Sequence, residues 1–148
     1  MKKWLALLVA LPVAALAAVQ EKTVALGGDV TEIVYALGAQ SSLVARDSTS
    51  QWPPEVAKLP DVGYLRQLNA EGILAMRPTQ MLASQQAQPS LVLKQLEQNN
   101  VQVISVPSRN DLSVIDEKVQ VIAKATHREA EGETLRNSVR QAIAALPT

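Results

Sequence analysis

The 148-residue sequence contains no cysteine, no phenylalanine and a single histidine. The absence of cysteine excludes a disulfide scaffold, a thiolate zinc site and a cysteine nucleophile. With His127 alone, neither a histidine-rich metal site nor a two-histidine zinc peptidase motif can form, and we expect His127 to be a solvated surface residue. Aromatic residues are scarce as well, and the chain has only Trp4, Tyr35, Trp52 and Tyr64. The position of any exposed aromatic side chain therefore carries information about function.

An excess of charge of one sign is also lacking. Fourteen basic and fourteen acidic residues give a formal net charge of zero. Bulk electrostatic binding of nucleic acid needs clustered excess lysine and arginine, so no nucleic-acid partner is expected. Hydrophobic residues make up 47% of the chain, which is too apolar for disorder. The length favours one globular domain.

Residues 1–17 have the pattern of a secretory signal peptide. Lys2 and Lys3 precede an apolar run from Trp4 to Leu16, and small residues for a cleavage site follow at Ala15-Leu16-Ala17. The run is short for a stable membrane span, and a retained membrane anchor is the alternative. We therefore expect export to the periplasm through a cleaved signal peptide.

Between residues 22 and 108, short apolar runs alternate with helical patterns. The runs predict four strands, at 23–26, 43–45, 81–83 and 101–106. Helices are expected between them, the last opened by Pro89 with Leu91, Leu93 and Leu96 along its apolar face. This alternation predicts an α/β fold, with a parallel sheet flanked by helices.

Local signals predict where two of the helices begin and end. Asp29 and Glu32 have the spacing of a capping box, and Gly38 is suited to end the same helix. Asn69 can cap a short helix that ends before Arg77-Pro78.

The segment 111–146 carries helical periodicity at both ends and a polar middle. One interpretation is a single long linker helix that acts as a strut between two bodies, of which one is present. The other is two ordinary helices packed on the sheet. The pattern alone leaves both open.

The familiar enzyme motifs are missing. The stretch Gly27-Gly28-Asp29-Val30-Thr31 matches neither a dinucleotide-binding nor a Walker motif, and no serine lies in a nucleophile elbow. We therefore do not expect an enzyme, and a small doubly wound enzyme is a minor alternative.

The most distinctive loop is Asp61-Val62-Gly63-Tyr64-Leu65-Arg66-Gln67. In an extended loop the side chains of Tyr64 and Arg66 point the same way. A neighbouring guanidinium and a ferric ion both favour the phenolate, and tyrosine is a known ligand of haem iron. A tyrosine that only anchors the loop is the common alternative.

Four stretches resemble the periplasmic haem-binding proteins of bacterial haem ABC importers. These stretches are residues 27–39, 45–50, 59–74 and 86–90, and the resemblance as a whole extends over the sequence after the signal peptide. The run from Gly63 to Gly72 is specific to the haem branch. The general layout is shared with cobalamin and siderophore carriers.

The resemblance implies a monomeric protein that binds ferric haem, takes part in iron acquisition and delivers its ligand to an inner-membrane ABC permease. It implies that Tyr64 is the haem-iron ligand, Arg66 its polarising neighbour and Glu71 a permease-docking acid. It also implies two α/β lobes joined by a backbone helix, of which the sequence holds the amino-terminal lobe (22–108) and that helix (111–146). The carboxy-terminal lobe is absent, and His127 does not match the histidine ligand that some members carry there.

Two further alternatives remain at this stage. A siderophore or cobalamin carrier would use Tyr64 for packing and not for ligation. A nonfunctional fragment of a binding protein is the other alternative.

Overall fold

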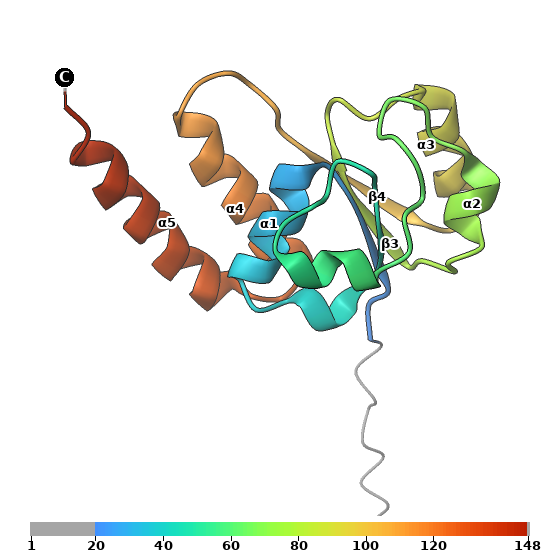
Figure 1. The fold of residues 1–148 in the computed structure, drawn as a ribbon, viewed down its shortest axis with the longest axis horizontal. Coiled ribbons are helices and arrows are strands. Elements are labelled where there is room, and N and C mark those ends of the chain that lie inside the picture. Colours follow the sequence, from blue (N-terminus) through green and yellow to red (C-terminus); the bar gives the residue numbers. More distant parts are fainter. Residues whose placement is uncertain (1–19, 148) are drawn as a thin grey trace, which may run out of the picture.

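The computed structural model describes residues 20–147, which form a four-stranded parallel sheet with helices on both faces (Figure 1). The strand order is β2-β1-β3-β4. The strands are β1 (Thr23–Leu26), β2 (Leu43–Arg46), β3 (Gln80–Ser84) and β4 (Gln102–Val106). The helices are α1 (Gly28–Ala36), α2 (Ala70–Leu74), α3 (Ser90–Gln98), α4 (Ser113–Ala125) and α5 (Glu129–Ala144), with short 3-10 helices at Gln40–Ser42 and Pro54–Lys58. The predicted parallel α/β fold is confirmed, whereas the predicted signal peptide lies outside the described residues.

The two central strands explain why the apolar runs were readable in the sequence. Strands β1 and β3 are buried along their whole length, as expected for parallel strands covered on both faces. Strand β4 lies within the apolar run 101–106 that predicted a strand, yet it is an edge strand with Gln102 and Ser105 exposed. Within residues 20–147 no helix is long and apolar enough to cross a membrane.

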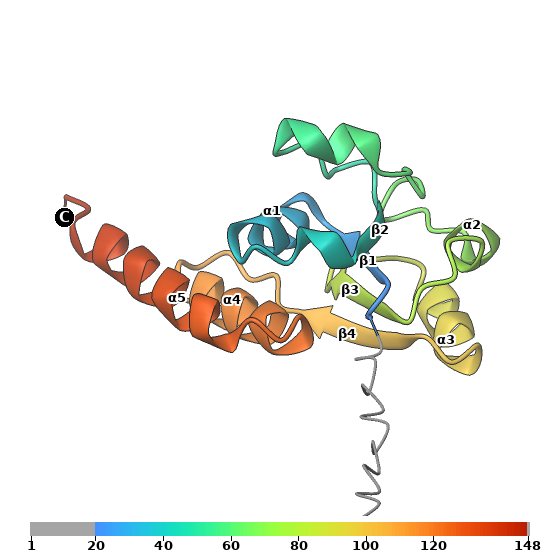
Figure 2. The same ribbon diagram turned by 90° about the horizontal axis from the view of Figure 1, so that it is seen from below.

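Each face of the sheet has its own core. Figure 2 shows α1 and α4 on one side of the strands, with α2 and α3 on the other. On one face Val24, Met81 and Leu26 pack against Ile73 of α2 and Leu96 of α3. On the other face, side chains of β1, β3 and β4 pack against α1 and α4, and that core is formed by Ala25, Leu82, Val106, Val30, Val34, Val119 and Ile122. The sheet is thus held rigidly between two helical layers, and its strand ends are fixed.

The predicted capping box at Asp29 and Glu32 is wrong. Helix α1 begins at Gly28, with Gly27 as a cap that makes no side-chain hydrogen bond. Asp29 lies inside the first turn, and its carboxylate pairs with Lys118 Nζ of α4 at 2.5 Å. The early start depends on close packing, because a Cβ atom on Gly28 would lie 2.8 Å from the carbonyl oxygen of Thr49. A long-range contact has therefore replaced a local one.

Other local predictions are confirmed. Gly38 follows α1 with a φ of 70°, a left-handed conformation that suits glycine. Asn69 Oδ1 accepts hydrogen bonds from the backbone N–H groups of Glu71 (2.9 Å) and Gly72 (3.4 Å), and so caps α2. In α3, however, the expected apolar face is wrong at Leu91, which is 63% exposed. Val92 and Leu96, four residues apart, form the buried face instead.

The segment 111–146 forms two helices, so the single linker helix is wrong. The chain breaks after Thr126, where His127 takes a φ of 58° and the N–H of Arg128 bonds to the carbonyl of Ala123. Helix α4 then packs on the sheet and α5 packs along α4. Contact at Gly132 is so close that an added Cβ would lie 2.5 Å from Ala123 Cβ. As expected, His127 is an exposed residue.

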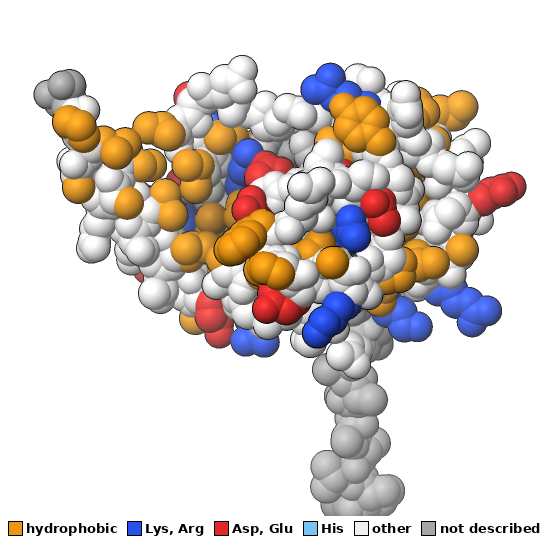
Figure 3. All heavy atoms as spheres, in the orientation of Figure 1, with side chains coloured by type: hydrophobic (Ala, Val, Ile, Leu, Met, Phe, Trp, Pro, Cys, Tyr) orange, Lys and Arg blue, Asp and Glu red, His pale blue; other side chains and the backbone are white. Residues whose placement is uncertain are grey.

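Helix α5 carries apolar side chains away from the sheet towards the end of the chain (Figures 1 and 3). Leu135 and Val139 are half-buried in a groove of about 280 Å³ shared with α1 and α4. Ala142 and Leu146, further along, are exposed. The apolar face of α5 is therefore only partly covered within the described residues.

Candidate functional site

The loops that follow the four strands meet beyond the carboxyl ends of the strands, at the top of the sheet in Figure 1. In parallel α/β sheets, ligands bind in the crevice outside the carboxyl ends of the strands. A cavity of about 360 Å³ opens at these strand ends and receives residues from all of these loops. Its lining includes Gly28, Thr49, Ser84, Gln86, Ser108 and Arg109. A second cavity of about 670 Å³ is lined by Arg66, Gln67, Gln85, Gln88 and Pro89.

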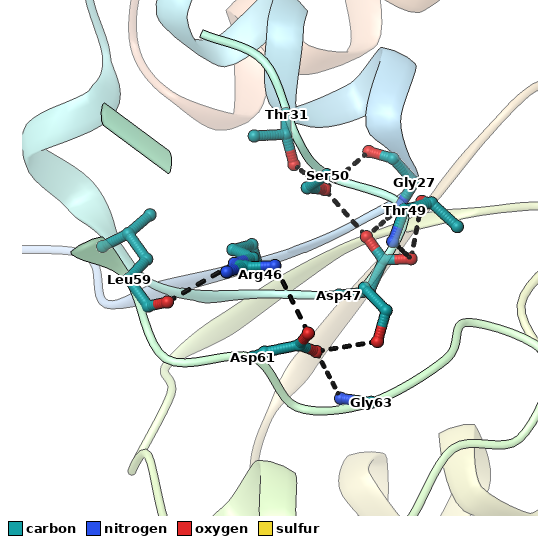
Figure 4. Close-up of polar contacts among 10 residues, drawn as sticks. Gly27, Thr31, Arg46, Asp47, Thr49, Ser50, Leu59, Asp61 and Gly63 are labelled. Carbon is teal, nitrogen blue, oxygen red and sulfur yellow. Dashed lines mark hydrogen bonds and ion pairs between the residues drawn. The ribbon is translucent and has the colours of Figure 1, made fainter. Parts of the chain in front are cut away.

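A buried carboxylate joins the ends of β1 and β2 (Figure 4). Asp47 is fully buried, and its Oδ1 accepts hydrogen bonds from the N–H of Gly27 (3.0 Å) and the hydroxyl of Ser50 (2.8 Å). Its Oδ2 accepts one from the hydroxyl of Thr49 at 2.7 Å. These bonds compensate for the burial of a charge. Asp47 therefore holds Gly27 and Thr49, two residues that line the 360 Å³ cavity.

Sequence reasoning gave Asp47 no role of its own. The sequence did contain one signal of a buried, hydrogen-bonded carboxylate. Asp47 comes directly after a predicted strand and is followed by the small hydroxyl residues Ser48, Thr49 and Ser50. Such a run can satisfy a buried carboxylate locally. The bond from Gly27, twenty residues away in the sequence, had no local signal.

The segment leading to Tyr64 runs along the free edge of β2. The N–H of Arg46 bonds to the carbonyl of Pro60, and the N–H of Val62 bonds to the carbonyl of Arg46. Ser48 N–H then bonds to the carbonyl of Gly63 at 2.9 Å. These bonds continue the sheet by one parallel bridge between Arg46 and Asp61. The chain therefore reaches Tyr64 at the carboxyl ends of the strands, where the loops after the strands also meet.

Tyr64 and Arg66 lie in a turn and not in the extended loop that we predicted. The N–H of Gln67 bonds to the carbonyl of Tyr64 at 2.8 Å, and the intervening Leu65 is buried. The carbonyl of Leu65 accepts a hydrogen bond from Gln88 N–H, which ties the turn to the loop after β3. Both predicted site residues are exposed, Tyr64 with 43% of its surface accessible. A buried leucine thus anchors a turn that presents a phenol and a guanidinium to solvent.

Arg66 also contacts the loop after β3. Its Nη2 donates a hydrogen bond to Gln86 Oε1 at 3.4 Å. Gln86 lines the 360 Å³ cavity and Arg66 lines the larger one, so this bond lies between the two. Glu71, the predicted docking acid, is exposed in the first turn of α2, the short helix that follows the turn.

The charged groups around the smaller cavity are paired. Arg109 binds Glu117 at 2.7 Å and Asp111 at 3.2 Å, and Lys118 binds Asp29. The hydrogen bond from Arg109 holds the pKa of the Glu117 carboxyl below its usual value. Hydrogen bonds from Ser113 and then Arg109 lower the pKa of Asp111. The cavity therefore offers hydroxyl and amide groups beside cations that already have partners.

Another cavity lies at the opposite end of the sheet, where the strands begin. It has a volume of about 350 Å³ and is lined by Glu21, Gln80, Lys124 and His127 among others. Its buried side chain, Gln80, donates to Thr23 Oγ1 and to the carbonyl of Ala125 at the end of α4. Among residues 20–147 no cluster of three or more acidic, histidine or cysteine side chains is arranged to hold a metal ion.

This architecture defines a class: a parallel α/β lobe with a cavity at the carboxyl ends of its strands and a helix that leads away from the sheet. The family profile described as periplasmic binding protein matches residues 23–147. The chain belongs to that family.

Relatives of known name agree with this assignment. A vitamin B12-binding protein of Pectobacterium atrosepticum is 28% identical over 129 residues, which cover 87% of this chain and 46% of the relative. The solved periplasmic haem-binding protein HutB of Vibrio cholerae is 38% identical with a TM-score of 0.81, covering 86% of this chain and 49% of that one. The haem-binding protein RhuT of Roseiflexus sp. RS-1 is 36% identical with a TM-score of 0.82, covering 85% and 48%.

The chain spans about half the length of these relatives. All three are named as binding proteins, in agreement with the prediction that the chain is not an enzyme.

Proposed function

We propose that this chain is the amino-terminal lobe of the substrate-binding component of an ABC importer, and that its ligand is ferric haem. In this proposal the protein works in the periplasm and delivers haem to a membrane permease. The observation that carries the proposal is the exposed phenol of Tyr64, held by a hydrogen-bonded turn at the strand-end edge of the sheet.

The chemistry of the turn suits ferric iron. A phenol has an ordinary pKa of about 10, so it ligates strongly only where its anion is favoured. Ferric iron supplies that preference on binding, and tyrosine is an established axial ligand. Arg66 lies in the same turn and adds a positive charge close to the proposed iron ligand in the sequence. We therefore assign Tyr64 as the iron ligand and Arg66 as the residue that tunes it.

The surroundings also suit a large flat ligand. Two cavities of about 360 and 670 Å³ flank the contact between Arg66 and Gln86. Both haem-binding neighbours are more than 35% identical to this chain, which supports haem over other cargo.

Cobalamin is the second candidate ligand, favoured by the names of the curated relatives in Pectobacterium and Vibrio. A cobalamin carrier would use Tyr64 for packing, because its cobalt already carries its own ligands. The glutamines around the larger cavity, Gln67, Gln85 and Gln88, are suited to hydrogen-bond the amide groups of such a ligand.

A parallel titration separates the two candidates. Haem and cyanocobalamin are added separately to the purified protein, and absorbance spectra are recorded. We expect the haem complex to show the charge-transfer bands of a high-spin ferric phenolate. We expect the Tyr64→Phe protein to lack these bands. Tighter binding of cyanocobalamin than of haem would favour the second candidate. A Tyr64→Phe protein with an unchanged haem spectrum would remove Tyr64 from the iron.

A further inference from the structure

We infer that Asp61 is the positioning residue of the site: its carboxylate sets the path of the chain into Tyr64. This inference rests on the proposed function, in which Tyr64 is the iron ligand. Sequence reasoning assigned Asp61 no role.

Three donors converge on the Asp61 carboxylate (Figure 4). Oδ1 accepts from the N–H of Gly63 at 2.8 Å and from the hydroxyl of Ser48 at 3.0 Å. Oδ2 lies 3.3 Å from Arg46 Nη1. Arg46 and Ser48 flank Asp47 at the end of β2, so these bonds join the loop to the rigid edge of the sheet.

The backbone at Gly63 needs this support. Its φ is 101°, a conformation that L side chains rarely adopt, and no atom lies within 4 Å of where a Cβ would be. A side chain at position 63 would therefore find no packing partner outside its chain neighbours, and the backbone polar groups of Gly63 are its visible attachments. Its N–H is held by Asp61 and its carbonyl by the N–H of Ser48. The direction in which Tyr64 leaves the sheet is thus set by hydrogen bonds to the two peptide groups that flank the Cα atom of Gly63.

Asp61 contributes little to the core. Its side chain is 40% exposed and belongs to neither apolar cluster. The Arg46 side chain is 15% exposed and keeps a hydrogen bond to the carbonyl of Leu59 when Asp61 is removed. Asp47, by contrast, is fully buried and joins two strands. Loss of Asp61 is therefore expected to disorder the approach to Tyr64 while the fold persists.

The test compares Asp61→Ala with Asp61→Asn. The asparagine keeps a side-chain oxygen for Gly63 and Ser48, so it should retain near-normal haem binding. The alanine removes the acceptor of all three donors and should bind haem about tenfold more weakly. It should also weaken the ferric phenolate bands and speed hydrogen exchange at the Gly63 amide. Glu131→Gln, which alters a comparable surface pair with Arg128 on α5, is the matched control and should change none of these.

A second pair of variants covers the case in which Asp61→Ala does not fold. Gly63→Ala introduces strain at a positive φ without a steric clash, and should weaken haem binding as Asp61→Ala does. Gly72→Ala, in α2 with equally open space, should not.

The outcomes separate the two proposals. If Tyr64→Phe abolishes the phenolate bands but Asp61→Ala and Gly63→Ala leave affinity and spectrum unchanged, Asp61 has no positioning role. Unchanged exchange at the Gly63 amide in Asp61→Ala would also overturn it, whether or not haem binds. If Tyr64→Phe itself has no effect, the proposed haem ligand is wrong, and the exchange measurement still decides whether Asp61 holds the loop.

Discussion

Arg136 Nη2 of α5 lies 2.9 Å from Asp116 Oδ2 of α4, and Arg140 lies 3.0 Å from the other oxygen. Hydrogen bonds from Arg136 and Arg140 lower the pKa of the Asp116 carboxyl from its usual value of 3.8. The charged carboxylate is therefore the form that holds α5 against α4. Two arginines, one turn apart on α5, share one acid on α4.

The ion pairs of Asp116 with Arg136 and Arg140 predict that the packing of α5 on α4 is sensitive to acid. Because the folded pKa of Asp116 is lowered, its contribution is present above pH 4 and is lost as the pH falls through the folded value. Asp116→Asn should lower the melting temperature at pH 7 by about 2–4 °C. The gap from the wild type should be smaller at pH 3 than at pH 7, because protonation of the carboxyl begins to weaken the pair below its usual pKa of 3.8. An equal gap at both pH values would contradict the prediction, and Glu131→Gln serves as a surface control.

Close packing at Gly132 predicts a reversal of ordinary helix propensity. Alanine is normally favoured over glycine within a helix, yet here its Cβ would lie 2.5 Å from Ala123 Cβ. Gly132→Ala should therefore destabilise the protein by about 1–3 kcal/mol in urea unfolding. Gly72→Ala has open space around it and should be neutral or stabilising. The double variant Gly132→Ala/Ala123→Gly should recover part of the loss, and no recovery would mean that the contact is not responsible.

Arg66 should act on haem binding less strongly than Tyr64. It adds charge near the proposed ligand without bonding the metal, so Arg66→Ala should weaken haem binding by about tenfold while the phenolate bands remain. Arg66→Lys keeps the charge, so its haem affinity should lie between those of the wild type and Arg66→Ala. The measurement is haem titration by absorbance. A loss of the bands in Arg66→Ala as complete as in Tyr64→Phe would show that its role is misassigned.

Glu71 should matter to delivery and not to ligand binding. Its carboxylate is exposed in the first turn of α2, a position that the helix dipole also favours for an acid. Glu71→Ala in the full transport protein should leave haem affinity unchanged and reduce association with the permease. Glu97→Ala in α3, another exposed acid, is the control. Normal haem uptake by the Glu71→Ala protein would remove the docking role.

Several predictions from the sequence succeeded because they rest on neighbours in the chain. Strands β1 and β3 are buried on both faces, so they appear as continuous apolar runs. The cap at Asn69 and the turn at Gly38 use groups within three residues. Tyr64 and Arg66 are selected by residue type and by the family resemblance, their roles remain predictions, and their turn was wrongly predicted as an extended loop.

The errors occurred where a distant partner decided the outcome. Asp29 has the spacing of a cap, but Lys118, eighty-nine residues away in the sequence, takes its carboxylate. The break at His127 has no strong local signal, because it depends on α5 folding back onto Ala123.

The sequence by itself determined the alternation of strands and helices, the absence of thiol and histidine chemistry, and the loop that carries Tyr64. All of these follow from residue type and short-range periodicity. Only the tertiary structure decided that segment 111–146 is two helices and that Asp47 and Asp61 bind the strand-end loops. Those outcomes depend on hydrogen bonds and steric contacts between residues far apart in the chain, which form only when the sheet brings their segments together.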